Sequence, residues 1–311
     1  MKIGKTASKD NFRRQYYFFA SARNAFKSFL KSLNLHPAEK ILLPSYIGWS
    51  SREGSGIFDP VQELNIPYRF YNLTENLDID PNHINELISN DSKIKVLLLV
   101  HYFGFPDKQF AQIAFKAKSK GIIVIEDEAH SLYSDLIGGI CGRVGDASFF
   151  SLHKMLPINY GGMLMLNDQK PACNHEFLSH TAIQDENLQP FRYDIKKIAE
   201  ARIINAEKIY RRLKNEESYF GLIKPLEKGI CPQTVPVIIK NGKRDHLYFK
   251  LNELGFGVVS LYHTLINQIS EKEFSVTHGI SKQILNLPVH QDIAEEDMNI
   301  FLDTLIREVK T

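Results

Sequence analysis

The strongest constraint on the fold is the alternation of continuous apolar runs with amphipathic segments over the first half of the chain. Residues 95–100 (KVLLLV) and 122–127 (IIVIED) are rich in Val, Ile and Leu, whereas residues 80–90 and 107–121 have apolar side chains at helical spacing. Such strands, separated by helices, indicate a mostly parallel sheet covered by helices on both faces. We therefore predict an α/β fold.

The remaining segments extend this pattern and then change it. Further strands are expected at residues 40–46, 66–73, 146–152 and 161–168, and further helices at 21–35 and 194–217. After the long helix the pattern becomes that of a smaller α+β unit. We predict a large α/β domain over residues 1–205 and a small C-terminal α+β domain over residues 206–311.

Composition excludes several classes of function. The chain has 38 Lys and Arg against 36 Asp and Glu, a formal net charge of +2, so it lacks the basic surface of a nucleic-acid-binding protein. Three widely spaced cysteines favour neither a disulfide framework nor a C-x-x-C metal site. The start of the chain has no apolar leader segment, and no stretch approaches transmembrane length. We expect a cytoplasmic protein with no nucleic-acid or membrane partner.

Polar residues follow the predicted strands at their carboxyl ends, where ligands bind to sheets of this kind. They are far apart in sequence but are expected to converge: Ser45 and Tyr46, His101 and Tyr102, Asp127 and His130, and Ser151 to Lys154. Lys154 stands out, because a lysine inside an apolar run costs free energy to bury unless it is paired or used.

Three local motifs admit other functions. Asp127 to His130 spell Asp-Glu-Ala-His, the sequence of a helicase box, but the phosphate-binding loop that this reading needs is lacking, since Gly4-Lys5-Thr6 stands too near the start. Ser151 and Lys154 match the Ser-x-x-Lys of β-lactamases without its partner motifs. Asp127 and His130 at helical spacing would form a metal pair, yet no third and fourth ligand is evident, so we predict no metal.

Taken in order, several segments resemble the DegT/DnrJ/EryC1/StrS family of pyridoxal-phosphate-dependent sugar aminotransferases. The segments are SARNAF, ILLPSYIGWSS, LTENLDIDPNHINELI, LLLVHYFGFP, GIIVIEDEAHSL, GDASFFSLHK, YGGMLMLND, VVSLYH and ILNLPVHQDIAEEDM. The resemblance implies the type I fold of these enzymes, the cofactor pyridoxal 5'-phosphate and a homodimer.

The resemblance also implies roles for individual residues. Lys154 would form the Schiff base with the cofactor's aldehyde, and a desolvated lysine amine suits that chemistry. Asp127 would hold the pyridine nitrogen protonated, and His130 would lie beside the phenolic oxygen. Taken alone, Asp127 is equally explained as a helix N-cap, and His130 as a buried core histidine.

The phosphate would bind at the start of the first predicted helix. Ser21, Ala22 and Arg23 stand where the family commonly has Ser-Gly-Thr, and an N-cap serine followed by an exposed arginine is the competing interpretation. Ser151 matches the family's phosphate-binding serine, with His153 beside it.

Three further residues complete the predicted site. Trp49 lies one position after the aromatic residue that usually covers the pyridine ring, and core packing explains it nearly as well. Tyr262 and His263 resemble the region where the small domain approaches the substrate.

Two features depart from the family. Its pattern is Ser-x-His-x-x-Lys, but Leu156 occupies that last position here, and Lys154 comes only three residues after Ser151. Either the Schiff-base lysine is lost, or the segment follows the Ser-x-His-Lys arrangement of cysteine desulfurases and basic amino-acid decarboxylases, which we favour. The chain is also shorter than most members, and residues 171–194 contain no clear equivalent of the loop that reaches the neighbouring subunit's phosphate.

We expect transfer of an amino group, with glutamate as donor, to a keto group of a nucleotide-linked sugar. Two alternatives remain: a pyridoxal-phosphate enzyme acting on another small amino substrate, and a non-catalytic scaffold that retains the fold.

Overall fold

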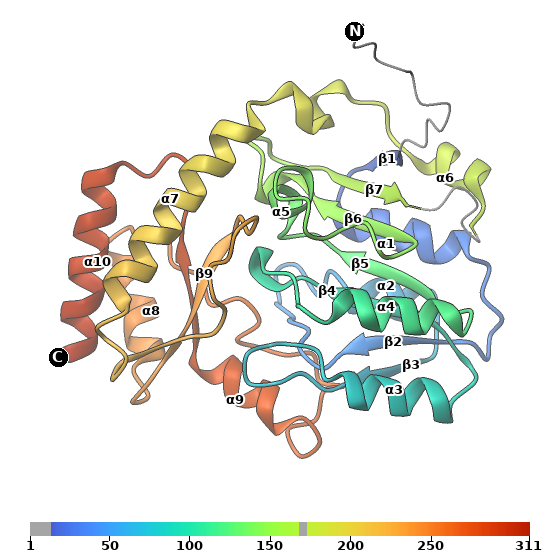
Figure 1. Cartoon of the computed structure of the whole chain (residues 1–311), viewed down its shortest axis with the longest axis horizontal. Helices are drawn as coiled ribbons and strands as arrows, with labels where there is room; N and C mark the ends of the chain where they lie inside the picture. The colour runs from blue at the N-terminus through green and yellow to red at the C-terminus, as the bar shows by residue number, and fades with distance from the viewer. Residues whose placement is uncertain (1–13, 168–172) are drawn as a thin grey trace, which may run out of the picture.

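The computed structural model describes residues 14–167 and 173–311. The segment Gly4-Lys5-Thr6 and the start of the chain, on which the leader prediction rests, lie outside these residues. Two β-sheets organise the described part (Figure 1). The larger has seven strands in the order β1-β7-β6-β5-β4-β2-β3, and the smaller has three in the order β10-β9-β8.

Five neighbouring strands of the large sheet pair in parallel, as the apolar runs predicted. Strand β7 is antiparallel to both of its neighbours, so β1 runs in the same direction as those five. Their bounds are β1 Gln15–Phe19, β2 Lys40–Pro44, β3 Tyr68–Tyr71, β4 Ile94–Val100, β5 Ile123–Asp127, β6 Ala147–Ser151 and β7 Gly162–Leu166. Strands β6 and β7 are buried along their whole length, which is the burial expected for a sheet covered on both faces.

Helices cover both faces of this sheet; in Figure 1 α3 and α4 lie in front of it and α1 behind. The helices of this part are α1 Ala22–Ser32, α2 Phe58–Glu63, α3 Pro81–Asn90, α4 Phe110–Ser119, α5 Leu132–Leu136 and α6 His175–Thr181, with short 3-10 turns η1 Tyr102–Gly104, η2 Leu152–Lys154, η3 Glu186–Leu188 and η4 Pro190–Arg192. The helix starts follow from side-chain capping: Ser21 accepts a hydrogen bond from the backbone of Asn24, and Asp80 caps α3 ahead of Pro81.

The rest of the chain builds the small sheet and its helices. The elements are α7 Ile195–Leu213, β8 Phe220–Leu222, β9 Thr234–Ile239, α8 Arg244–Glu253, α9 Ser275–Gln283, β10 Ile284–Pro288 and α10 Glu295–Lys310. The long α7 connects the two sheets in Figure 1. Its first turns pack with Leu132 and Phe150 near the large sheet, and its last turns join the apolar core around β9. The predicted boundary at residue 205 falls inside this helix and stays a prediction.

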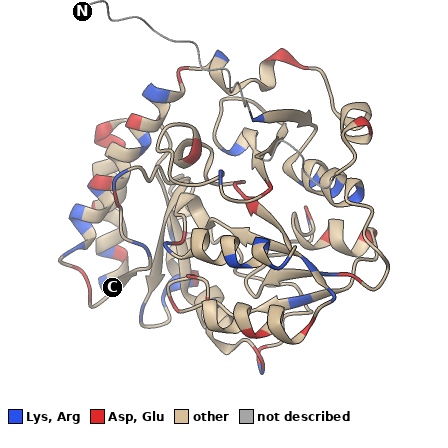
Figure 2. Cartoon of the chain, turned by 45° about the vertical axis from the view of Figure 1, so that its right-hand side comes forward, with Lys and Arg blue, Asp and Glu red and all other residues tan. Residues whose placement is uncertain are grey.

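Basic and acidic residues, coloured on the ribbon of Figure 2, are interspersed along the helices. Among the helices of the described residues, none combines the length and the apolar character needed to cross a membrane.

Candidate active site

The ends of three neighbouring strands meet at one edge of the large sheet. In the parallel register Val100 pairs with Asp127, and Asp127 pairs with Phe149, so the residues that follow β4, β5 and β6 lie side by side. The backbone N–H of His101 donates to the carbonyl of Asp127 at 3.2 Å and holds these ends together. The predicted convergence of His101, Asp127 and the Ser151–Lys154 segment is therefore present.

Lys154 reaches this edge through the 3-10 turn η2. The backbone N–H of Leu152 donates to the carbonyl of Gly161 at 3.0 Å, and the N–H of Met155 donates to Leu152 at 3.0 Å. This tight turn carries the side chain inward, and the Lys154 Nζ lies 2.9 Å from Nε2 of His130. A lysine three residues after Ser151 thus reaches the site.

The hydrogen bonds of His130 determine which partner donates to Lys154. The backbone N–H of Phe103 points at His130 Nδ1 from 3.2 Å, so Nδ1 is an acceptor. Burial lowers the pKa of His130 well below its usual value, with the Lys154 charge acting in the same direction, and the ring is neutral. The proton of the neutral ring is therefore on Nε2, which can donate to the Lys154 amine whenever that amine is unprotonated.

An amine that accepts a hydrogen bond is unprotonated and nucleophilic. Burial lowers the pKa of Lys154 too, while Asp127 and Glu53 oppose that effect. The environment of this lysine therefore favours the free amine that the sequence analysis required.

Asp127 is 5% exposed at the end of β5. Burial raises its pKa to about 6, although the backbone N–H of Ala129 donates to the carboxylate at 2.8 Å and Lys154 adds a favourable charge. This hydrogen bond between Asp127 and Ala129 is the local capping contact that the alternative interpretation of Asp127 as an N-cap predicts. Asp127 nevertheless lies close enough to Lys154 for their charges to interact, so it belongs to the same site.

The first turn of α1 closes against the start of β7. A Cβ on Gly162 would lie 2.2 Å from the carbonyl carbon of Ser21 and 2.4 Å from the nitrogen of Ala22, so only glycine permits this approach. Backbone N–H groups at a helix start have no intrahelical acceptors and suit an anion. The Gly161-Gly162 pair was the only sequence signal for this contact.

Arg23 and the Ser151–His153 pair have local partners. The Arg23 guanidinium forms an ion pair with Asp59 at 3.3 Å and hydrogen-bonds the carbonyl of Glu53. Ser151 is 3% exposed, and its Oγ lies 3.4 Å from Nδ1 of the exposed His153. Arg23 is thus engaged with the loop after β2, whereas Ser151 is buried at the end of β6.

The structure separates the three remaining predicted residues. Trp49 is 47% exposed, so its indole is at the surface. The ring of Tyr262 lies near-parallel to His130, with centroids 6.3 Å apart. His263 is exposed, and its Nδ1 contacts the carbonyl of Ser260 at 2.7 Å. Of these three, only Tyr262 lies beside Lys154's partner.

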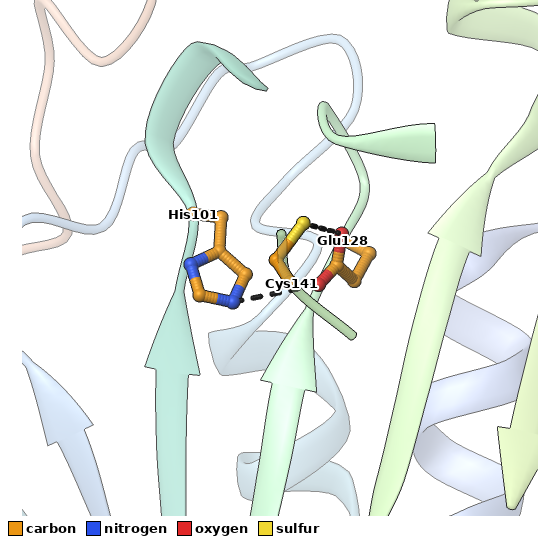
Figure 3. A group of neighbouring side chains, drawn as sticks. All are labelled: His101, Glu128 and Cys141. Carbon is orange, nitrogen blue, oxygen red and sulfur yellow. Dashed lines mark hydrogen bonds and ion pairs between the residues drawn. The ribbon is translucent and has the colours of Figure 1, made fainter. Parts of the chain in front are cut away.

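A second buried polar cluster next to the site was missed by the sequence analysis (Figure 3). His101 Nε2 lies 2.9 Å from Glu126 and 3.4 Å from Oε1 of Glu128, and the Cys141 thiol donates to the other oxygen of Glu128 at 3.2 Å. Ligand atoms of His101, Glu128 and Cys141 lie within 4.8 Å of one another, which gives the cluster the composition of a metal site. Its neighbouring glutamates, however, differ in protonation.

Burial raises the pKa of Glu128 well above its usual value, and the adjacent Glu126 and Asp135 raise it further, which favours the protonated form of Glu128. Burial also acts to raise the pKa of Glu126. There, hydrogen bonds from His101 and from the backbone N–H groups of Gly142 and Gly145 outweigh burial, and the pKa of Glu126 is lowered. The pKa values of the two glutamates are thus shifted in opposite directions, and within the described residues Oε1 of Glu128 and Nδ1 of His101 have no hydrogen-bond partner.

Comparison with known proteins places this geometry in a family context. Residues 19–196 match the model of the DegT/DnrJ/EryC1/StrS aminotransferase family. A dTDP-4-dehydro-2,3,6-trideoxy-D-glucose 4-aminotransferase from Saccharopolyspora spinosa is 27% identical over 55% of this chain and 43% of its own length. A UDP-4-amino-4,6-dideoxy-N-acetyl-beta-L-altrosamine transaminase from Campylobacter jejuni is 24% identical over 86% of this chain and 78% of its own length.

Solved structures show the fold. Helicobacter pylori PseC, an aminotransferase involved in the biosynthesis of pseudoaminic acid, aligns with a TM-score of 0.77 at 17% identity, over 95% of this chain and 87% of its own. The Bacillus subtilis protein NtdA, solved with bound cofactor PMP, aligns with a TM-score of 0.76 at 18% identity, over 96% of this chain and 74% of its own. The predicted type I α/β fold is therefore confirmed.

Proposed function

We propose that this chain, which belongs to the DegT/DnrJ/EryC1/StrS aminotransferase family, is a pyridoxal-phosphate-dependent aminotransferase that acts on a keto group of a nucleotide-linked sugar. The relatives named as dTDP-sugar and UDP-sugar transaminases support this substrate class. The observation that carries the proposal is the convergence of Lys154, His130 and Asp127 at the end of one sheet. We take glutamate as the amino donor.

The chemistry of these side chains fits the cofactor. An aldehyde needs an unprotonated amine, which His130 stabilises at Lys154 through the 2.9 Å contact. A pyridine nitrogen needs a buried carboxylate, which Asp127 offers. A phosphate needs free backbone N–H groups, which the start of α1 presents where Gly162 lets β7 approach. Ser151, buried nearby, adds a hydroxyl.

When bound, pyridoxal phosphate supplies an aldehyde that carries the amino group and a ring that accepts an electron pair. The chain's residues supply the rest. Lys154 would hold the aldehyde through its amine, and its free amine would act as the base that takes up and returns a proton. His130 would keep the Lys154 amine unprotonated. Asp127 would hold a proton on the ring nitrogen, and burial of the site would exclude water.

We also propose a homodimer in the cytoplasm. The exposed aromatic side chains of Trp49, Tyr160 and Phe191 support a second subunit that would cover them. The free thiols of Cys141, Cys173 and Cys231 support a reducing compartment. Sedimentation equilibrium is expected to give the mass of two 35.7 kDa chains; a single-chain mass would refute the dimer.

The test of the proposed function is spectroscopic. Wild-type protein and Lys154→Ala are each incubated with pyridoxal phosphate, freed of excess and scanned from 300 to 500 nm, with a borohydride-treated sample digested to locate the labelled peptide. We expect a visible band in the wild type alone and reduction to fix the label on Lys154. Addition of glutamate should then bleach the band, and keto-sugar nucleotides should restore it. A colourless wild type would instead support a scaffold that retains only the fold.

A further inference from the structure

The space above Gly48 is filled by a side chain from the other end of the chain. A Cβ added to Gly48 would lie 2.1 Å from Cδ1 of Tyr262 and 3.0 Å from two further atoms of its ring. Gly48 is also one position before Trp49, and is therefore where the sequence analysis placed the family's usual cofactor-covering aromatic. The residue expected to supply a ring has none, and the ring of Tyr262 lies in its place.

Two sets of contacts fix the loop that carries Tyr262. On the small sheet's side, Ser260 Oγ donates to the carbonyl of Ile284 at 2.9 Å, and Leu261 N–H donates to Asn286 at 3.0 Å. On the large sheet's side, Trp49 N–H donates to Thr264 at 3.0 Å, and Ile266 N–H donates to Ile47 at 3.0 Å. The loop therefore joins the strand β10 to the segment after β2, and Tyr262 lies at this junction.

The backbone of Tyr262 is unusual for a residue with a side chain. Its φ is +62°, in the left-handed region that a non-glycine residue enters at an energetic cost. Surrounding structure must hold it there, and the loop's hydrogen bonds do so. Strain at a residue whose ring lies beside His130 indicates that the position of this ring is required for function.

The ring joins an aromatic group at the strand ends. Its partners are Tyr46 at 5.4 Å, Tyr102 at 6.1 Å, Phe103 at 6.1 Å and His130 at 6.3 Å between centroids. The first two meet it edge-on, whereas the planes of Tyr262 and His130 differ by only 29°. Tyr262 thus lies near-parallel to the histidine that contacts Lys154.

A ring bound between these two rings would need two van der Waals contacts of about 3.5 Å, about 7 Å in all. The centroids of Tyr262 and His130 are 6.3 Å apart, so the Tyr262 ring would have to move outward to cover a bound heteroaromatic ring. We propose that Tyr262, seated over Gly48, is the residue that covers one face of the bound pyridine ring, in place of the side chain that position 48 lacks.

This proposal rests on the proposed function and assigns the small-sheet part of the chain a direct role in retaining the cofactor. It also explains Gly48, because any side chain there would collide with Tyr262. The competing possibility is that the tyrosine occupies the place of the pyridine ring itself and excludes it. These two possibilities predict opposite effects of removing the ring.

The experiment measures the equilibrium and rate constants of pyridoxal phosphate binding by visible absorption and by quenching of the fluorescence of Trp49. Four proteins are compared with wild type: Tyr262→Phe, Tyr262→Leu, Gly48→Phe, and the double variant Gly48→Phe with Tyr262→Leu. Leu keeps an apolar side chain without a ring, and melting curves show whether each variant is folded.

We expect Tyr262→Phe to match wild type and Tyr262→Leu to lose roughly three- to tenfold in affinity through faster release, the size of one aromatic contact. Gly48→Phe alone should bind poorly because two rings compete for one space, and the double variant should recover most of the loss. Unchanged or tighter binding by Tyr262→Leu would overturn the proposal. If wild type and all variants fail to bind, the proposed function itself fails, which is a different result.

Discussion

The Lys154 amine lies 2.9 Å from Nε2 of His130, whose other ring nitrogen is occupied by the backbone N–H of Phe103. One backbone donor thus fixes the tautomer of a buried histidine, and the histidine in turn favours the free amine of the lysine. Phe103 has a φ of +59°, and this strained turn presents its N–H to His130. The reactivity of Lys154 is therefore controlled by the residues that follow β4.

Replacing His130 should shift the pH dependence of Lys154. His130→Phe keeps a ring beside Phe103 but removes the donor to the amine, so the pKa of Lys154 should rise. Loss of one hydrogen bond corresponds to about one pH unit. The rate at which the protein reacts with pyridoxal phosphate, measured from pH 6 to 10, should have its midpoint moved upward by that amount.

His130→Gln is the matched control, because its amide can still donate to the lysine. It should keep the midpoint close to that of wild type. Equal midpoints in wild type and His130→Phe would show that burial alone sets the protonation of Lys154.

Asp127 should make stability depend on pH. Its folded pKa of about 6 is above the ordinary 3.8, so the folded state binds more protons and loses stability as pH rises through that window. A shift of roughly two pKa units corresponds to about 3 kcal/mol above pH 6. Asp127→Asn removes this cost, so in urea unfolding of the cofactor-free protein it should be little different from wild type at pH 4 and clearly more stable at pH 7.5.

The same variant should lose amino transfer while still reacting with pyridoxal phosphate through Lys154. A stability difference that does not change between pH 4 and pH 7.5 would mean that folding does not raise the pKa of Asp127.

Glu128, drawn in Figure 3, and its neighbour Glu126 should respond oppositely to the loss of a carboxylate. Glu126 is the anion that accepts hydrogen bonds from His101, Gly142, Val144 and Gly145. Glu126→Gln replaces one accepting oxygen with a donor and should cost about 2 to 4 kcal/mol of unfolding free energy.

Glu128→Gln should be tolerated. Because the folded pKa of Glu128 is raised, wild type loses stability as pH increases above the ordinary value of 4.5, and the glutamine variant does not. Its unfolding free energy relative to wild type should therefore grow between pH 5.5 and 8.5. Equal destabilisation by both substitutions would show that both carboxyls are ionised.

The alternation of apolar runs predicted the large sheet because each buried strand is a continuous apolar segment, which adjacent residues alone reveal. Strands β2, β4, β5, β6 and β7 and helices α1, α3, α4 and α7 lie where the pattern indicates. The short α5 and α6 and the strand β8 were not predicted, since three to seven residues give too little periodicity. Their formation depends on tertiary packing.

The site was predictable only in part for a similar reason. Residues that end parallel strands must converge, which identified Asp127, His130 and Lys154. The place of Tyr262 depends on a loop more than 200 residues from Gly48, and no local pattern contains that contact. The protonation of Glu128 likewise depends on Cys141 and on Asp135, which reach it only in the folded chain.

Gly162 provides the sharpest test of how the phosphate end of the site is built. Its missing Cβ would meet backbone atoms of Ser21 and Ala22, which cannot rotate away as a side chain would. Gly162→Ala must therefore push the start of α1 from β7. We expect a loss of about 1 to 3 kcal/mol in unfolding free energy. We also expect the variant to prefer pyridoxal phosphate over pyridoxal less strongly than wild type does.

Gly279→Ala is the control, because a Cβ there meets nothing within 4 Å and the residue lies inside helix α9. Alanine should stabilise that helix by up to about 1 kcal/mol and leave cofactor binding unchanged. The preference for pyridoxal phosphate over pyridoxal is the deciding measurement, because a purely structural effect of Gly162→Ala would weaken both ligands equally. A preserved preference would therefore place the phosphate away from the start of α1, and a lost preference would tie its binding to the glycine that lets β7 approach the helix.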